Sequence, residues 1–136
     1  MRRINHEEAI KLIEEGKRIF KAATEWLRNS GYGEIDEEKS VQLECKRLGI
    51  DTDTFYLLVG IGSPKNIFNL LTGEGRLEEG PIEDKIAFEI HEIVEREEIF
   101  KMLGEMRRID EIPEEVFKKA HEIAKYWEEK FLSSDC

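Results

Sequence analysis

Cysteine is scarce in this chain of 136 residues, which contains only Cys45 and Cys136. Two cysteines support neither a disulfide framework nor a cysteine metal site, and we expect both thiols to stay reduced. Long apolar runs are missing as well, because no stretch of 18 or more apolar residues occurs. The first ten residues turn acidic before any apolar run begins, which predicts that no signal peptide is present. We therefore expect a soluble, cytoplasmic protein.

Basic residues are also fewer than acidic residues. The chain has 21 Lys and Arg residues against 31 Asp and Glu residues, a net charge of −10. This excess of acidic residues opposes non-specific attraction to nucleic acid and to anionic membrane surfaces. A protein partner with a basic surface is therefore favoured over either of these. Gln42 is the single glutamine. This charged, amide-poor usage resembles that of thermophile proteins, and it says little about function.

The most apolar segment runs from Thr54 to Thr72 and carries one charge, Lys65, in a chain of which 38% of residues are charged. Such a segment forms either the centre of a core or an apolar surface kept for a partner or ligand. Asp51 and Ser63 are suitable N-caps for two short helices within it. This favours the core, and we expect the segment to be largely buried.

Apolar residues recur at three- and four-residue steps through most of the chain. This spacing predicts an all-α single domain over residues 1–136, built as a bundle of about six helices. The long first, fifth and sixth helices are expected at 6–30, at 82–108 and from 113 onward, and three short helices follow caps at Asp36, Asp51 and Ser63. The glycine-rich loop 73–81 is expected to be the most flexible internal loop, joining helical halves 1–72 and 82–136.

Residues 55–61, FYLLVGI, leave one local ambiguity, because their composition also suits a β-strand. A strand before the turn GIGSPK would allow a phosphate-binding loop. A lone strand has nothing to pair with, however, and no other segment is similarly enriched in β-branched and aromatic residues. We therefore predict a helix, with a strand as the alternative.

Residues 41–59, VQLECKRLGIDTDTFYLLV, resemble the helix-turn-helix signature. Cys45 lies four positions before Gly49, and a tight crossing of two short helices needs a small side chain and a glycine at such places. For DNA binding the second helix would need cations or amides, and it has none, whereas Asp51 and Asp53 would repel phosphates. We expect the corner formed by these two helices to pack in the core. The alternative is that the protein is a helix-turn-helix DNA-associated regulator.

The predicted fifth helix carries two apolar stripes. One stripe contains Ile82, Ile86, Ile90, Ile93, Phe100 and Leu103, and the nearly opposite one contains Phe88, His91, Ile99, Met102 and Met106. Two stripes indicate either the central helix of a bundle or a helix packed both on its own core and on a partner, and both arrangements bury the same residues. For the second arrangement we assign the interface to Phe88, Ile99, Met102 and Met106, with a homo-oligomer, such as a homodimer, as the expected assembly.

Candidate metal ligands are few. His91 and Glu95 stand at i and i+4, a spacing at which one helix can hold a metal ion. Neither 88–91 nor 118–121 contains the Glu-x-x-His pattern of di-metal carboxylate bundles, which this chain resembles only loosely, and His121 lies at the edge of its apolar stripe. We assign no metal and no cofactor, and we keep His91 and Glu95 as the weaker alternative.

Catalytic motifs are not recognisable in the sequence, and we assign no catalytic residue. Neither cysteine adjoins a histidine, and Ser63 in GIGSPK lacks the setting of a nucleophile elbow. Ser63 and Lys65 at a helix start could bind an anion, although plain capping by Ser63 is the simpler expectation. These patterns together predict a non-catalytic interaction or self-associating module. A DNA-associated regulator and a small-molecule or metal-binding helical protein are the alternatives.

Overall fold

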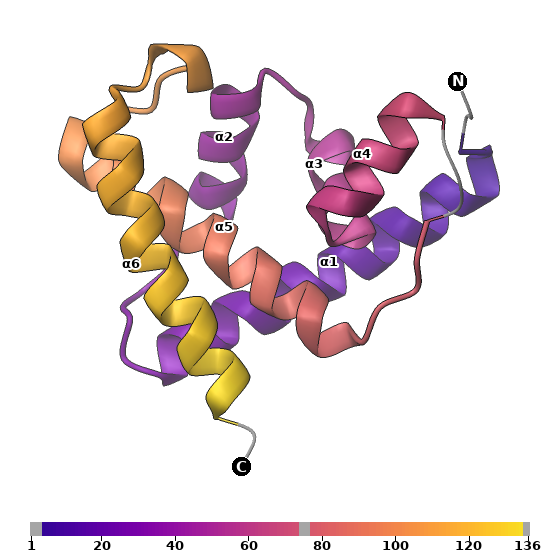
Figure 1. The fold of residues 1–136 in the computed structure, drawn as a ribbon, viewed down its shortest axis with the longest axis horizontal. Coiled ribbons are helices and arrows are strands. Elements are labelled where there is room, and N and C mark those ends of the chain that lie inside the picture. Colours follow the sequence, from indigo (N-terminus) through magenta and orange to yellow (C-terminus); the bar gives the residue numbers. More distant parts are fainter. Residues whose placement is uncertain (1–3, 74–76, 135–136) are drawn as a thin grey trace.

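The computed structural model describes residues 4–73 and 77–134, and throughout these residues the regular structure is helical. Figure 1 shows the helices α1 (His6–Asn29), α2 (Glu37–Leu48), α3 (Thr52–Ile61), α4 (Pro64–Thr72), α5 (Ile82–Leu103) and α6 (Glu114–Ser133), with a short 3-10 turn, η1 (Ile109–Glu111). The prediction of an all-α bundle of about six helices is confirmed. The alternative of a strand at residues 55–61 is wrong, because these residues lie within α3.

The helix starts follow the capping residues that the sequence indicated. The side chains of Asn5, Asp36, Asp51 and Ser63 each accept a hydrogen bond from the backbone N–H three residues later, at 2.7 to 3.1 Å. Each bond satisfies one backbone donor that has no partner within its helix. Helix α5 ends at Leu103 rather than at Arg108, because Gly104 adopts a left-handed conformation (φ 72°) that terminates it.

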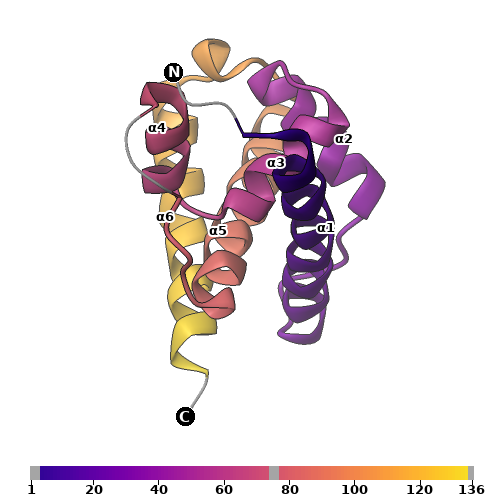
Figure 2. The same ribbon diagram turned by 90° about the vertical axis from the view of Figure 1, so that its right-hand side faces the viewer.

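Helices α1 and α3 cross with their backbones in contact, as Figure 2 shows from the side. A Cβ atom on Gly16 would lie 1.9 Å from the backbone oxygen of Tyr56, and one on Gly60 would lie 2.0 Å from the backbone oxygen of Leu12. Only glycine allows this approach, because real Cβ contacts are never this short. The crossing places α3 against α1 and turns its other face towards α2, α4 and α5.

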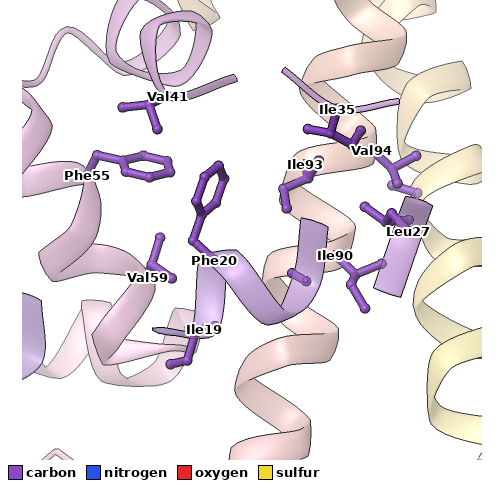
Figure 3. Close-up of a cluster of buried hydrophobic side chains, with 12 residues drawn as sticks. Ile19, Phe20, Leu27, Ile35, Val41, Phe55, Val59, Ile90, Ile93 and Val94 are labelled. Atoms are coloured by element: carbon purple, nitrogen blue, oxygen red, sulfur yellow. The ribbon is translucent and has the colours of Figure 1, made fainter. Parts of the chain in front are cut away.

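Helix α5 is the central helix of the bundle, packed against α1 on one side and α6 on the other. The larger core cluster joins α1, α2, α3, α5 and α6, and Figure 3 shows Phe20 between Phe55 of α3 and Ile93 of α5. The second cluster is formed by Leu43, Ile99, Met106, Ile112 and Ala120. Both apolar stripes of α5 are therefore largely covered within the chain, as expected for the central helix of a bundle.

This packing corrects the proposed self-association face. Ile99 and Met106 are buried at 0% and 2% exposure in the second core cluster, so they cannot contact a partner. Met102 is exposed at the end of α5, and Phe88 is half-buried near the other end of the same helix. The four residues do not form one continuous surface.

The apolar segment 54–72 divides into two unlike parts. Helix α3 is largely covered, with Phe55, Val59 and Ile61 in the core, whereas α4 leaves Phe68 and Leu71 at 60% and 64% exposure. The expectation that the segment is largely buried is therefore wrong for α4. Buried Asn66 holds α4 in place by bonding the backbone of Ile61 and of Glu78. Within the glycine-rich loop 73–81, residues 74–76 lie outside the described part, and its predicted flexibility stays a prediction.

Candidate functional site

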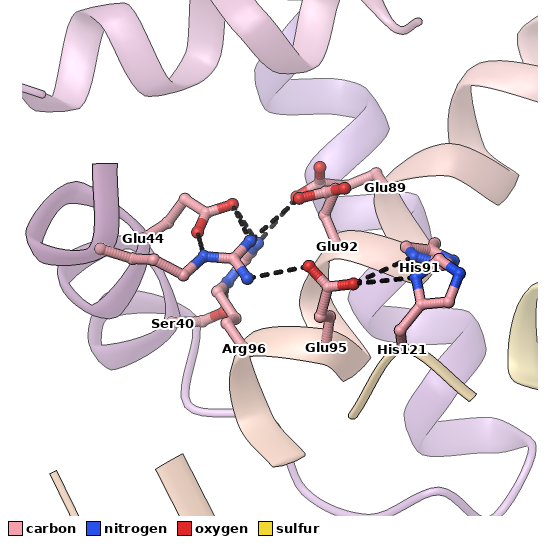
Figure 4. A network of polar contacts seen from close by, with 9 residues as sticks. Ser40, Glu44, Glu89, His91, Glu92, Glu95, Arg96 and His121 are labelled. Carbon is pink, nitrogen blue, oxygen red and sulfur yellow. Dashed lines mark hydrogen bonds and ion pairs between the residues drawn. The ribbon is translucent and has the colours of Figure 1, made fainter. Parts of the chain in front are cut away.

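Two buried arginines organise a polar network between α2 and α5 (Figure 4). Arg47, 2% exposed, donates from Nε and Nη2 to both oxygens of Glu44 at 2.6 and 3.0 Å. Its guanidinium also reaches Glu92 at 3.0 Å and Glu95 at 2.9 Å on α5. The planar five-donor group of arginine suits this role, because it can serve three carboxylates at once.

Arg96 is the second centre of the network and is fully buried. Its guanidinium donates to the Ser40 hydroxyl at 2.9 Å, to Glu44 at 3.3 Å and to Glu89 at 3.2 Å. It also lies over the ring of Phe55, 5.4 Å from the ring centroid. Arg47 and Arg96 thus share Glu44, and together they link α2 to one side of α5.

Four carboxyl groups surround these two arginines, so the network has more acid than base. Burial raises the pKa of Glu89 to about 8, because the attraction of Arg96 does not offset the loss of hydration. Burial and the neighbouring charge of Glu44 raise the pKa of Glu92. For Glu95, burial is outweighed by hydrogen bonds from His91 and Arg47, which lower its pKa.

A cavity of about 350 Å³ opens beside this network, between α4 and the helices α2, α3 and α5. Its apolar wall is formed by Leu48, Ile50, Phe55, Leu58, Val59, Pro64, Ile67, Phe68, Leu71 and Phe88, and its polar lining by Glu44, Glu89 and Glu92. No lysine, arginine or histidine of the described residues lines it. Below we call it the α4 pocket.

The α4 pocket offers hydrogen-bond acceptors that the protein does not use. Glu89 and Glu92 each contact an arginine through Oε2, and within residues 4–73 and 77–134 no donor reaches the Oε1 atom of either. Among the described residues no fully buried side-chain oxygen lacks a hydrogen-bond partner, so these two oxygens are open to the pocket, where a donor from outside the chain could reach them. The pocket combines a large apolar wall with a few polar groups, as small-molecule sites do.

A second group of polar residues lies where α5 meets α6. The Nε2 atom of His91 lies 3.2 Å from Oε2 of Glu95, and the Nδ1 atom of His121 lies 3.3 Å from that same oxygen. The other nitrogen of His91, Nδ1, lies 2.9 Å from Oε1 of Glu128. Burial opposes a charge on His91, but its contacts with Glu95 and other acids outweigh burial and raise its pKa.

The residues singled out in the sequence are distributed over several places. Phe88 lines the α4 pocket, and His91 and Glu95 meet as their i, i+4 spacing predicted. Ser63 caps α4 through its hydroxyl, and Lys65 contacts Glu78 at 2.7 Å on the surface. The weak anion site at Ser63 and Lys65 stays a prediction, and both of its polar groups already have partners within the chain.

The helix-turn-helix-like segment forms a corner between α2 and α3, with Gly49 in the left-handed conformation (φ 68°) at the turn. The second helix of this corner is packed against α1 over much of its length. Its exposed first turn presents Thr52 and Asp53, which carry no positive charge for a phosphate. The corner serves the packing of the bundle.

Several residues of these sites were missed from the sequence: Glu44, Arg47, Glu89, Glu92, Arg96 and His121. A signal was present in α5, because a helix with two opposite apolar stripes must be covered on both sides. The charged residues between the stripes, Glu89 and Arg96 among them, are then forced into the interior, where they need partners. Nothing in the sequence indicated that His121 would face His91.

None of the described helices combines the length and apolarity that crossing a lipid bilayer requires. Comparisons of the chain with protein-family models, with curated proteins and with solved structures found no match.

Proposed function

We propose that this protein is a binding protein for a small organic cation, an ammonium group attached to an apolar body, held in the α4 pocket. The observation that carries this proposal is the Oε1 atom of Glu92, which no donor among the described residues reaches, in a pocket otherwise lined by Glu44, Glu89 and apolar side chains. An ammonium group donates hydrogen bonds and accepts none, so it matches a lining that offers carboxyl acceptors.

Charge supports the same ligand class. Glu89, with a pKa of about 8, is largely protonated at pH 7, so the network beside the pocket has Glu44, Glu92 and Glu95 against two arginines, a formal excess of one negative charge. Both arginines lie in the network behind the pocket-lining carboxyls and do not line the pocket themselves. An anionic ligand would meet repulsion from these carboxyls, whereas a cation would compensate them.

The apolar wall supports a ligand with a hydrocarbon or aromatic body. Phe68 and Leu71 line the pocket and are exposed, so a ligand body would remove apolar surface from water. The volume of about 350 Å³ lies within the range of small-molecule sites, about 300 to 1,000 Å³. We place this binding activity in the cytoplasm and assign no catalytic step to it.

Three matched compounds test the proposal by isothermal titration calorimetry at pH 7: 4-phenylbutylamine, 4-phenylbutanol and 4-phenylbutyrate. We expect the amine to bind at least about tenfold more tightly than the alcohol, which corresponds to about 1.4 kcal/mol, and the carboxylate to bind most weakly. Equal binding of amine and alcohol, or tightest binding of the carboxylate, would contradict the proposal.

Two variants assign the binding to the α4 pocket. Glu92→Gln removes one carboxylate, while Arg47 keeps its hydrogen bonds to Glu44 and Glu95. We expect this variant to lose the preference for the amine. Leu58→Trp fills the pocket and should weaken all three compounds. Glu83→Gln, at an exposed position in the first turn of the same helix, is the matched control and should bind as the wild type does.

A protein-interaction module, self-associating or with another partner, is the second candidate. The exposure of Phe68 and Leu71 on adjacent turns of α4 favours it, because a partner helix could cover both side chains. This candidate predicts no preference for the amine and, where the chain associates with itself, a molar mass above that of one chain, so the two functions give different results.

A further inference from the structure

The cluster of His91, Glu95 and His121 has the composition of a transition-metal site. His91 and Glu95 come from one face of α5 and His121 comes from α6, and one ligand atom from each residue lies within 4.8 Å of the others. The two imidazole rings stand 4.7 Å apart at an interplanar angle of 67°, so their nitrogen atoms converge on the carboxylate of Glu95 without stacking.

Two of the three distances in the cluster are close to the edges of a metal coordination shell, and the third, between the two histidine nitrogens, is at most 4.8 Å. Zinc binds histidine nitrogen and carboxylate oxygen at about 2.0 to 2.2 Å, so two ligand atoms of a tetrahedral site lie about 3.3 to 3.5 Å apart. The two separations that involve Glu95 Oε2 are 3.2 Å to His91 Nε2 and 3.3 Å to His121 Nδ1. A metal ion could be accommodated with small shifts of side chains that already face one another.

The surrounding contacts also hold the three ligands in orientations suitable for a metal. His91 can donate its Nδ1 hydrogen to Glu128 at 2.9 Å, which leaves Nε2 as the metal-binding atom. Glu95 receives Arg47 on Oε1 at 2.9 Å, which leaves Oε2 for the metal. Carboxylate partners behind ligating histidines and hydrogen bonds to ligating carboxylates are the usual outer contacts of protein metal sites.

We propose that His91 Nε2, Glu95 Oε2 and His121 Nδ1 bind one zinc-like divalent ion per chain, with a fourth position taken by water or by an external ligand. Two imidazoles and one carboxylate suit zinc and similar transition metals, whereas magnesium and calcium prefer oxygen ligands. The side chain of His121 is 53% exposed, so the fourth position is reached from solvent along α6. This site uses other side chains than the α4 pocket, and neither proposal depends on the other.

Metal titration of the full chain tests this proposal. Protein is freed of metal with a chelator, exchanged into metal-free buffer, and titrated with Zn²⁺ by calorimetry. Titration with Co²⁺ by visible absorption then reports the coordination number. We expect one equivalent per chain and the intense visible absorption of four-coordinate Co²⁺. We also expect no competition from millimolar Mg²⁺, and a higher thermal midpoint with Zn²⁺, because an ion that binds only the folded state stabilises it.

Substitution of the ligands decides where the ion binds. His121→Ala changes a largely exposed side chain, so the fold should persist by circular dichroism while the affinity for Zn²⁺ falls at least about tenfold. His6→Ala, at the exposed start of α1, is the matched control and should bind as the wild type does. Absence of stoichiometric binding, or wild-type affinity in His121→Ala, would overturn the proposal and leave the cluster as a set of hydrogen-bonded histidine and glutamate side chains.

Discussion

At the scale of single residues, the unusual feature is the number of charges in the interior. Arg96 is fully buried, and Arg47, Glu44, Glu89 and Glu95 are at most 5% exposed. Moving such groups out of water is unfavourable, and buried ion pairs often return little net stability. Removing one partner is nevertheless strongly destabilising, by about 3 to 5 kcal/mol, because the other charge is left without compensation. Replacing a side chain that is buried in its neutral form should not carry this loss of stability, because no charge is left without compensation.

Glu89 is the residue at which this difference can be measured. Its pKa is about 8 in the folded state, against an ordinary value of 4.5. Below pH 4.5 both folded and unfolded chains carry the proton, so Glu89 adds no pH dependence. Between pH 4.5 and 8 the unfolded chain releases the proton that the folded chain keeps, so the free energy of unfolding falls as the pH rises, and above pH 8 the loss is complete.

We therefore expect Glu89→Gln to remove part of this pH dependence. A glutamine keeps an acceptor for Arg96 and carries no ionisable group. Relative to wild type, the variant should gain at least about 1 kcal/mol of stability between pH 5 and pH 8. Urea unfolding at several pH values, with a chelator present, measures the difference. Glu83→Gln, on the exposed first turn of α5, is the control, and parallel pH profiles for wild type and Glu89→Gln would contradict the raised pKa.

At the scale of the elements, the contact of α1 with α3 determines where the other helices can lie. Gly16 sits in the middle of α1, where glycine is unfavourable for an isolated helix by about 1 kcal/mol relative to alanine. The close approach of the Tyr56 carbonyl explains why glycine occupies that place. Because α3 forms one wall of the α4 pocket, this crossing also controls the shape of the site.

Substitution of this glycine tests that explanation. Gly16→Ala improves helix propensity but puts a Cβ atom 1.9 Å from a backbone oxygen, so the helices must separate. We expect a net loss of about 2 kcal/mol or more in denaturant unfolding, in line with overpacked cores. Gly80→Ala is the control, since a Cβ atom there meets no heavy atom within 4 Å. A gain in stability for Gly16→Ala would show that propensity outweighs the close contact.

At the scale of the whole molecule, the two apolar stripes of α5 pack mainly against other helices of the same chain. Helix α6 covers the stripe that contains Ile99, and Met106 lies beyond the end of α5 in the same core cluster. The exposed apolar side chains that remain include Met102 at the end of α5 and the Phe68–Leu71 side of α4. These two surfaces belong to different parts of the molecule (Figure 1).

Light scattering of two variants distinguishes these surfaces. We expect Met102→Glu to leave the molar mass of the native protein unchanged, because its neighbours on the stripe are inaccessible to a partner. Leu71→Glu places a charge on the α4 side and is the companion variant. If the wild type is an oligomer, it should dissociate with Leu71→Glu and not with Met102→Glu. Dissociation by Met102→Glu alone would restore the interface predicted from the sequence.

Helix positions could be read from the sequence because their signals are local. A capping side chain such as Asp51 bonds a backbone N–H three residues away, and a left-handed glycine such as Gly104 ends a helix within one turn. The end of α5 was misplaced because apolar Met106 continues the periodicity after the helix has stopped. The pairing of His91 with Glu95 was also readable, since four residues make one turn of a helix.

The helical class, most of the helix boundaries and the amphipathic faces follow from the amino-acid sequence, because hydrogen bonding and side-chain periodicity act over a few residues. The contact of Gly16 with Tyr56, the link that Arg96 makes between Ser40 and Glu89, the open pocket beside α4 and the approach of His121 to His91 all arise from the packing of the helices. These contacts join residues far apart in the chain, and they depend on the crossing angles of the helices. Glutamate and arginine usually lie on the surface of a protein. Here the packing of the helices buries them, and they form the polar groups of a site.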